Sequence, residues 1–358
     1  MPPRRPIAPP APDPYPHARG RGALLGLVVG DALGSPLKAR NLIAPVFPTL
    51  AEGVHRVLRA GGPFELKKGQ VGESGQMACC LGVGLRELGT YDSDEQLRHY
   101  LRWQRHAQGM SPHTEEVMTE LLESPMPKAT AARRVWMRGG RKAADNGSLG
   151  RTAPLGVFFH QDQDSRLRAS FADSALTHFD PRCQLACATL NASIAHALNA
   201  GEGLDPQTLL HATLSELTVA SAILGRVLPD LVHEVSVATA MIREDLDAAR
   251  QDDPRLYWPE LHMHRKSTLV RVAFRLAYWE LMHAPSFEAA LVDVINRGGD
   301  TDVNGAVAGA LLGAFHGEEA IPTDWSHGVL EALGPRDGAL WNTYHPRQLL
   351  LLAPELEE

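Results

Sequence analysis

The sequence predicts an all-α fold, a compact single-domain helical bundle, and three observations carry this prediction. Apolar residues recur at helical spacing through most of the 358 residues. Strand-like alternation of apolar and polar residues is scarce. No internal repeat and no long linker divides the helical part of the sequence. Hydrophobic residues make up 44% of the chain, which is enough for a large buried core.

Segments of helix length follow one another along the chain, and several of them carry start signals. Ser93 stands before two acidic residues, Asp205-Pro206 opens a helical pattern, and Ser286 precedes an acidic first turn. The spacing of apolar residues predicts helices over 22–34, 75–88, 94–108, 208–224, 232–250 and 268–283.

The two ends of the chain differ in composition from this helical part. Residues 1–19 are rich in proline and arginine, and we expect a disordered arm there. The domain then spans residues 20–350 and a tail spans 351–358. The first residues lack the apolar core of a signal peptide, and no apolar run reaches the roughly 18 residues of a membrane span. We therefore expect a cytoplasmic protein with no membrane contact.

Charge and cysteine content limit the classes of protein further. The formal net charge of -7 argues against a nucleic-acid binder that works through bulk electrostatics, although a local basic pocket for an anion remains compatible with it. Cys79 and Cys80 are adjacent, and neither they nor Cys183 and Cys187 form a CxxC pair. We interpret all four as small buried residues in a reducing compartment rather than as zinc ligands.

Two helical segments repeat glycine at every fourth residue. The glycines are Gly22, Gly26, Gly30 and Gly34 in one segment, and Gly305, Gly309, Gly313 and Gly317 in the other. Each interior glycine costs a helix about 0.5–1 kcal/mol relative to alanine, so close packing must offset the loss. Spacing of four places the glycines on one helix face, which predicts two central helices whose backbones approach closely.

Acidic residues stand at the ends of these two segments. Asp31 follows Gly30, and Asp300 and Asp302 precede the second segment. If the helices run antiparallel, the three carboxylates meet at one end of the bundle, where they need a cation or protons. Oxygen ligands of this kind suit Mg²⁺. The alternative for Asp302 is a simple helix cap.

Four stretches, taken together, resemble the ADP-ribosylglycohydrolase family. They occur in the family's order and span most of the chain from about residue 20 to 325. They are RGALLGLVVGDALGSPLK (21–38), NGSLGRTAPLG (146–156), SALTHFDPRC (174–183) and NRGGDTDVNGAVAGALLGAFHG (296–317). The resemblance implies an all-α fold with a two-magnesium centre in a cleft. It also implies cleavage of the glycosidic bond between ADP-ribose and an acceptor, often a protein arginine, so the expected partner is ADP-ribose or an ADP-ribosylated protein.

The resemblance assigns roles to residues one at a time. Asp300 and Asp302 match the metal-ligand and catalytic aspartates. The substrate-binding candidates are Asn146, Gly147, Ser148, His178, Gly298 and Gly299. Alternatives stay open: 146–148 is also common turn chemistry, and His178 could equally be a buried, hydrogen-bonded histidine. Arg151 could pair with a phosphate or with a core carboxylate.

The first metal motif departs from the family pattern. The usual Thr-Asp-Asp-Thr is Gly72-Glu73-Ser74-Gly75 here, which leaves Glu73 and the weak ligand Ser74 as candidates for catalysis and metal binding. Val303 replaces a threonine after Asp302, and Gly150 replaces a larger residue. Mg²⁺ demands near-ideal octahedral geometry, so we expect one weakly held Mg²⁺ (or Mn²⁺) or none.

Lys38 stands where many members of the family have a glutamate. Its ammonium could replace part of the lost positive charge, but we expect the side chain to point into solvent. Three functions remain: a hydrolase with an altered metal centre, an inactive member that binds ADP-ribose or an ADP-ribosylated partner, and a scaffold with an unused pocket.

Overall fold

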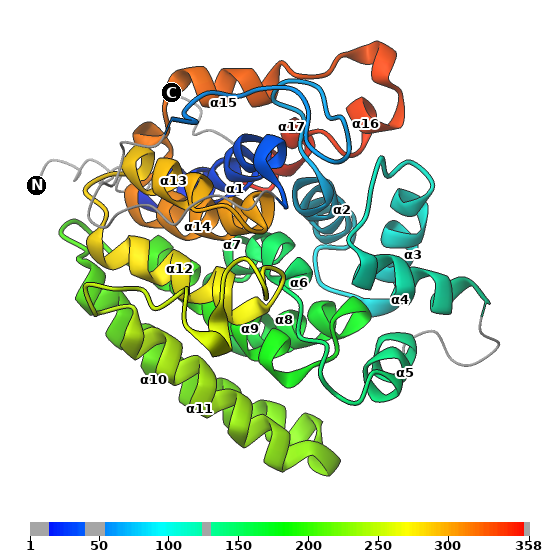
Figure 1. Cartoon of the computed structure of the whole chain (residues 1–358), viewed down its shortest axis with the longest axis vertical. Helices are drawn as coiled ribbons and strands as arrows, with labels where there is room; N and C mark the ends of the chain where they lie inside the picture. Colours follow the sequence, from blue (N-terminus) through cyan, green and yellow to red (C-terminus); the bar gives the residue numbers. More distant parts are fainter. Residues whose placement is uncertain (1–13, 40–53, 124–129, 354–358) are drawn as a thin grey trace, which may run out of the picture.

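Two antiparallel helices, α1 (Pro14–Gly34) and α14 (Thr301–His316), lie side by side at the centre of the molecule (Figure 1). Their glycines face each other: a Cβ on Gly22 would stand 2.2 Å from the carbonyl oxygen of Gly313, and one on Gly26 would stand 2.1 Å from that of Gly309. No side chain larger than hydrogen fits at such distances. The prediction of two closely packed central helices is confirmed.

The structure is a computed structural model that describes residues 14–39, 54–123 and 130–353. Within these ranges the secondary structure is helical, and β pairing is limited to the isolated bridges Gly61–Leu66 and Asp145–Leu269. The all-α fold class is therefore confirmed.

The remaining helices surround the central pair. The α-helices are α2 (Glu73–Leu88), α3 (Ser93–Gln104), α4 (Pro112–Glu123), α5 (Ala131–Arg138), α6 (Gly147–Arg151), α7 (Ala153–Phe158), α8 (Gln163–Thr177), α9 (Pro181–Asn199), α10 (Pro206–Val227), α11 (Val232–Ala248), α12 (Val270–His283), α13 (Phe287–Asn296), α15 (Thr323–Leu330), α16 (Ala339–Asn342) and α17 (Pro346–Leu350). Short 3₁₀ helices span Ser35–Leu37, Pro229–Leu231, Pro259–Leu261, Glu318–Ala320 and Pro335–Asp337. Each helix predicted from the sequence is observed.

Helix starts follow the expected chemistry with one shift. Asp205 accepts a hydrogen bond from the backbone N–H of Thr208, and Ser286 accepts one from Ala289, as their capping positions predict. At α3 the cap is Asp92 rather than Ser93, since the Asp92 carboxylate accepts from the N–H of Glu95.

The boundary of the N-terminal arm lies earlier than the sequence indicated. Residues 14–19 were expected to be disordered, which is wrong, because α1 already begins at Pro14. Arg19 anchors this first part by donating to the carbonyl oxygens of Ala197 and Ala200 at 2.7 and 2.6 Å. Residues 1–13 lie outside the described residues. At the other end Ala353 is buried, so the predicted tail packs at least at its start, and residues 354–358 lie outside the description.

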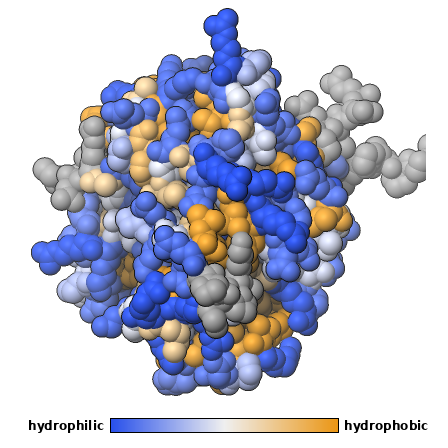
Figure 2. All heavy atoms as spheres, turned by 90° about the vertical axis from the view of Figure 1, so that its right-hand side faces the viewer, coloured by the Kyte–Doolittle hydropathy of each residue, from blue (hydrophilic) through white to orange (hydrophobic). Residues whose placement is uncertain are grey.

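Amphipathic helices build the outer layer. In α3, Leu97, Tyr100 and Trp103 are buried while the opposite face is charged. Figure 2 looks onto the right-hand side of Figure 1 and shows mostly hydrophilic residues, with an apolar strip near the middle. All four cysteines are free and buried, as expected.

Among the described helices, α10 alone has the length and mean hydropathy (1.2) of a membrane span, and 44% of that window is buried within the protein. It packs on α9 and α11, and this packing buries Leu209, Leu210, Leu217 and Leu224.

Candidate active site

A glycine turn brings the two C-terminal aspartates to the end of the central helix pair. Gly298 and Gly299 have φ values of 79° and 78°, a region that glycine adopts without steric cost, so the chain reverses sharply between α13 and α14. Thr301 then donates to the carbonyl oxygen of Gly34 at 2.7 Å. Asp300 and Asp302 are thereby held beside the last turn of α1.

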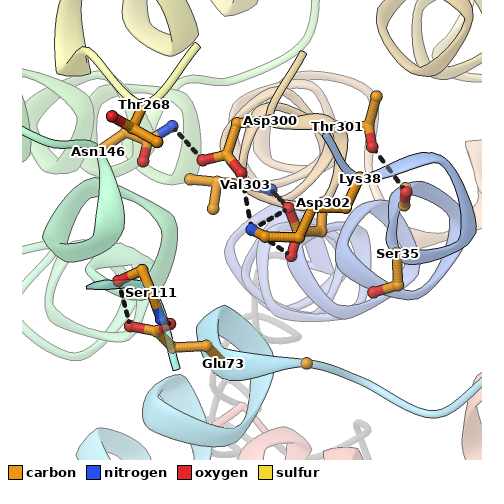
Figure 3. A network of polar contacts seen from close by, with 12 residues as sticks. Ser35, Lys38, Glu73, Ser111, Asn146, Thr268, Asp300, Thr301, Asp302 and Val303 are labelled. Atoms are coloured by element: carbon orange, nitrogen blue, oxygen red, sulfur yellow. Dashed lines mark hydrogen bonds and ion pairs between the residues drawn. The ribbon is translucent and has the colours of Figure 1, made fainter. Parts of the chain in front are cut away.

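Lys38 does not point into solvent, which corrects the expectation from the sequence. Its Nζ lies 2.6 Å from Oδ1 of Asp300 and 2.8 and 2.9 Å from the two carboxylate oxygens of Asp302 (Figure 3). The lysine side chain is 15% exposed. Burial alone would lower the pKa of Lys38, but the charges of Asp302 and Asp300 outweigh it and hold that pKa well above its usual value. The ammonium therefore stays charged between the two carboxylates.

Asp31 joins this end of the bundle but faces another element. Its carboxylate accepts hydrogen bonds from the backbone N–H groups of Gly72 and Gly75 at 2.9 and 2.6 Å. Burial raises the pKa of Asp31 to about 6, and these backbone hydrogen bonds oppose that rise. Asp31 thus holds the start of α2 in place. Burial likewise raises the pKa of Asp302 to about 7, against the charge of Lys38.

Glu73 turns toward the start of α4. Its carboxylate accepts from the backbone N–H of Ser111 at 2.6 Å and from the hydroxyls of Thr114 and Ser111 at 2.5 and 3.2 Å. Figure 3 shows Glu73 with Ser111, on the other side of the site from Asp300. Ser111 and Thr114 were not among the predicted site residues, although Ser111-Pro112 is a helix-start signal.

The other departures from the family pattern meet at one point. A Cβ on Gly150 would stand 2.5 Å from Oγ of Ser74 and 3.0 Å from Cγ1 of Val303. Ser74 and Val303 are both buried. Gly150 therefore leaves the space that these two side chains occupy.

The segment 146–148 is divided between the site and the core. Asn146 donates through Nδ2 to Oδ2 of Asp300 at 2.9 Å, and its backbone N–H donates to Thr268 O at 2.8 Å. The Ser148 hydroxyl is fully buried and contacts the hydroxyl of Ser174 at 3.0 Å. The side chain of Ser148 therefore belongs to the core.

His178 lies directly behind Gly147. It is 1% exposed, and its Nδ1 contacts the Thr177 hydroxyl at 2.8 Å. Its Nε2 has no hydrogen-bond partner among the described residues and would lie 3.0 Å from a Cβ on Gly147. Burial lowers the pKa of His178 well below its ordinary value, so the ring is neutral.

Arg151 pairs with a core carboxylate, which decides between its two alternatives. It is fully buried and donates to Oδ2 and to the backbone oxygen of Asp173 at 3.0 and 2.9 Å. Its guanidinium also lies 4.7 Å from the centre of the Tyr100 ring.

Many of the predicted site residues line one cavity of about 350 Å³. Glu73, Asn146, Gly147 and Asp300 line it, together with Lys38 and Val303. Carboxyl groups of Glu116 and Asp145 also face it. The cavity is thus a cleft between α2, α4, α6 and α14 that is lined by one lysine and by several carboxyl groups.

Comparison with known proteins identifies the fold. The sequence profile described as ADP-ribosylglycohydrolase matches residues 12–351. The chain belongs to the ADP-ribosylglycohydrolase family. It is 26% identical over 321 residues to an ADP-ribosyl-[dinitrogen reductase] glycohydrolase of Rhodospirillum rubrum, covering 86% of this chain and 89% of the relative.

Two further relatives extend the comparison. An ADP-ribosylarginine hydrolase of Pseudomonas putida is 25% identical over 319 residues, covering 86% of this chain and 73% of the relative. A solved structure of an ADP-ribosylglycohydrolase-related protein complex superposes with a TM-score of 0.66 at 25% identity, covering 95% of this chain and 98% of that one. Family membership supports hydrolysis of ADP-ribose linkages as the chemistry associated with this fold.

The arrangement of this chain does not fit the two-magnesium centre that the family implies. Both oxygens of Asp300 are engaged, one by Lys38 and one by Asn146. Both oxygens of Asp302 accept from Lys38, and Oδ1 also accepts from the N–H of Val303 at 3.0 Å. Across residues 14–39, 54–123 and 130–353, His, Cys, Asp and Glu side chains form no group of three or more that could hold a metal ion. The expectation of one weakly held ion, or none, remains a prediction.

Proposed function

We propose that this member of the ADP-ribosylglycohydrolase family binds ADP-ribose, or an ADP-ribosyl group on a protein, in the cleft without metal-dependent cleavage. The observation that carries the proposal is the ammonium of Lys38 between Asp300 and Asp302. A divalent cation would need the carboxylate oxygens that Lys38 already engages. Two-metal cleavage needs that cation, so we expect recognition without cleavage.

The acidic residues that line the cleft favour a ligand in which ADP-ribose is attached to a positively charged group. Glu116 and Asp145 line the cavity next to Glu73 and Asp300, whose oxygens already accept hydrogen bonds within the protein. Carboxylates accept hydrogen bonds from the planar guanidinium of arginine and from ribose hydroxyls. ADP-ribose attached to an arginine side chain therefore suits the cleft, and relatives at 25–26% identity are named for such substrates or for an ADP-ribosylated protein.

A second candidate is hydrolysis of the same linkage by an altered centre. Two observations favour it. Asp300 and Asp302 are both present, and the two relatives, whose matches each cover 86% of this chain, are named as hydrolases. In this case a cation would have to displace Lys38, so release of ADP-ribose should increase with Mg²⁺ or Mn²⁺.

Calorimetric titration and a release assay separate the two candidates. The purified full chain is titrated with ADP-ribose and with an ADP-ribosylated arginine peptide in EDTA, and free ADP-ribose is then followed with Mg²⁺, Mn²⁺ or EDTA. We expect saturable binding in EDTA and no release above that of an Asp300→Asn/Asp302→Asn control. Metal-stimulated release that the control lacks would establish the hydrolase instead.

A variant that fills the cavity tests where binding occurs. Ala143 lines the cleft, so Ala143→Trp should lower the affinity for ADP-ribose at least tenfold. Ala240→Trp at an exposed position of α11 is the matched control and should leave the affinity unchanged. Absence of binding by the unaltered protein would contradict the proposal and favour a scaffold with an unused pocket.

A further inference from the structure

The backbone around Lys38 is held on both sides. Its own N–H donates to the carbonyl oxygen of Ser35 at 3.3 Å, at the end of the 3₁₀ turn that follows α1. The next N–H, of Ala39, donates to the carbonyl oxygen of Gly299 at 2.9 Å. The glycine turn that positions Asp300 therefore also fixes the segment that carries the lysine.

The ammonium uses its full donor capacity inside the site. A lysine ammonium has three N–H donors, and the three oxygens within reach are Oδ1 of Asp300 and both oxygens of Asp302. These contacts measure 2.6–2.9 Å, in the range of charge-assisted hydrogen bonds. The lysine thus satisfies the carboxylates as a bound cation would, but with a single positive charge.

The residues around Lys38 that depart from the family pattern also offer few ligands for a metal ion. Ser74 and Val303 fill the space that Gly150 leaves, so the side of the site next to α2 and α6 offers a neutral hydroxyl and an apolar surface. Glu73 is held by Ser111 and Thr114 at the start of α4. Ligands that could complete an octahedral shell around a second ion are therefore replaced or engaged elsewhere.

We propose that Lys38 is a built-in replacement for a divalent cation, and that the position between Asp300 and Asp302 is a latent divalent-cation site that the lysine keeps closed. The inference rests on the proposed function, because it concerns the same cleft and explains how that cleft works without metal. Removing the ammonium leaves the buried carboxylates of Asp300 and Asp302 side by side without the positive charge that both now contact. Such a cluster attracts a divalent ion.

Binding of Mn²⁺ alone tests the inference without any ADP-ribose. Free Mn²⁺ is measured by electron paramagnetic resonance during titration of the full chain. We expect no saturable binding by the unaltered protein and one saturable Mn²⁺ site in Lys38→Met. Lys38→Met/Asp302→Asn should lose that site. Lys67→Met is the matched control, since Lys67 is 58% exposed and pairs with Asp337 away from the cleft.

Each outcome decides the inference. Saturable Mn²⁺ binding by the unaltered protein that Asp302→Asn abolishes would overturn it, as would a folded Lys38→Met that gains no site. If Lys38→Met is unfolded, Lys38→Gln keeps an N–H donor on a side chain one bond shorter, and thermal unfolding of both variants is compared with and without Mn²⁺. Recovery of folding by Mn²⁺ supports a latent site, and failure of Mn²⁺ to stabilise either variant counts against it.

The two proposals fail separately. The proposed function is contradicted if the protein does not bind ADP-ribose in EDTA, and the Mn²⁺ titration contains no ADP-ribose. The role of Lys38 is contradicted if the unaltered protein binds Mn²⁺, or if the lysine variants gain no Mn²⁺ site, whatever the affinity for ADP-ribose.

Discussion

The backbones of Gly30 and Gly305 touch where α1 crosses α14. A Cβ on Gly30 would stand 1.9 Å from the carbonyl oxygen of Gly305, and a Cβ on Gly305 would stand 2.4 Å from that of Gly30. This contact lies one turn from Asp302, so the distance between the two helices also sets the position of the carboxylates that Lys38 bridges.

Gly30→Ala should therefore destabilise the protein by at least about 1–3 kcal/mol, because a methyl group at this point forces the two backbones apart. Urea unfolding followed by circular dichroism measures the loss. Gly225→Ala is the control: Gly225 lies within α10 with open space around it, so alanine should add about 0.5–1 kcal/mol of stability. Equal effects of the two changes would contradict close backbone packing.

Restoring an acidic residue at the first metal motif should not restore a metal site while Lys38 is present. Ser74→Asp places a carboxylate in a buried position beside Val303, so we expect a loss of more than about 2 kcal/mol that Mn²⁺ does not reverse. In Lys38→Met/Ser74→Asp, Mn²⁺ should recover the loss. Thermal melts with and without MnCl₂ measure both, with Ser236→Asp as the exposed control. Metal-dependent stabilisation of Ser74→Asp alone would speak against the role of Lys38.

Arg151→Met should destabilise the fold by about 3–5 kcal/mol, because it leaves the buried carboxylate of Asp173 without its cation. Denaturant unfolding measures this change. Arg168→Met, which breaks an exposed pair with Asp164, should have little effect. A stable Arg151→Met with lost ADP-ribose affinity would instead indicate that Arg151 binds phosphate.

Acid should weaken the C-terminal segment through His345. Its Nδ1 accepts from the N–H of Arg347 at the start of α17, and burial, with help from Arg347, lowers the pKa of His345 to about 4. Since the folded pKa lies below the unfolded value of about 6.5, this stability is complete above pH 6.5 and is lost as the pH falls toward 4. This capping hydrogen bond contributes about 1 kcal/mol to the free energy of unfolding.

His345→Asn keeps a capping side chain that does not titrate, so its stability should decline less between pH 6.5 and 4 than that of the unaltered protein. Thermal unfolding at a series of pH values measures the difference. Parallel curves for the two proteins would rule out His345 as the source of the acid sensitivity.

Local patterns predicted the features that depend on residues close together in the chain. Asp205 and Ser286 cap their helices as expected, because capping involves a side chain and a backbone N–H three residues away. The glycine spacing predicted close packing, since spacing of four always lies on one helix face. The start of α1 was placed too late because proline, which disfavours helix interiors, is accepted in a first turn.

The sequence by itself determined the helical class, the family resemblance and the place of Asp300 and Asp302 at the end of two packed helices. Only the tertiary structure decided what the site residues contact. Lys38 meets Asp300 across 262 positions of the chain, and Glu73 meets Ser111 across 38. The physical reason is that a charged side chain adopts the direction in which a partner compensates its burial, and that partner comes from an element that no local pattern identifies.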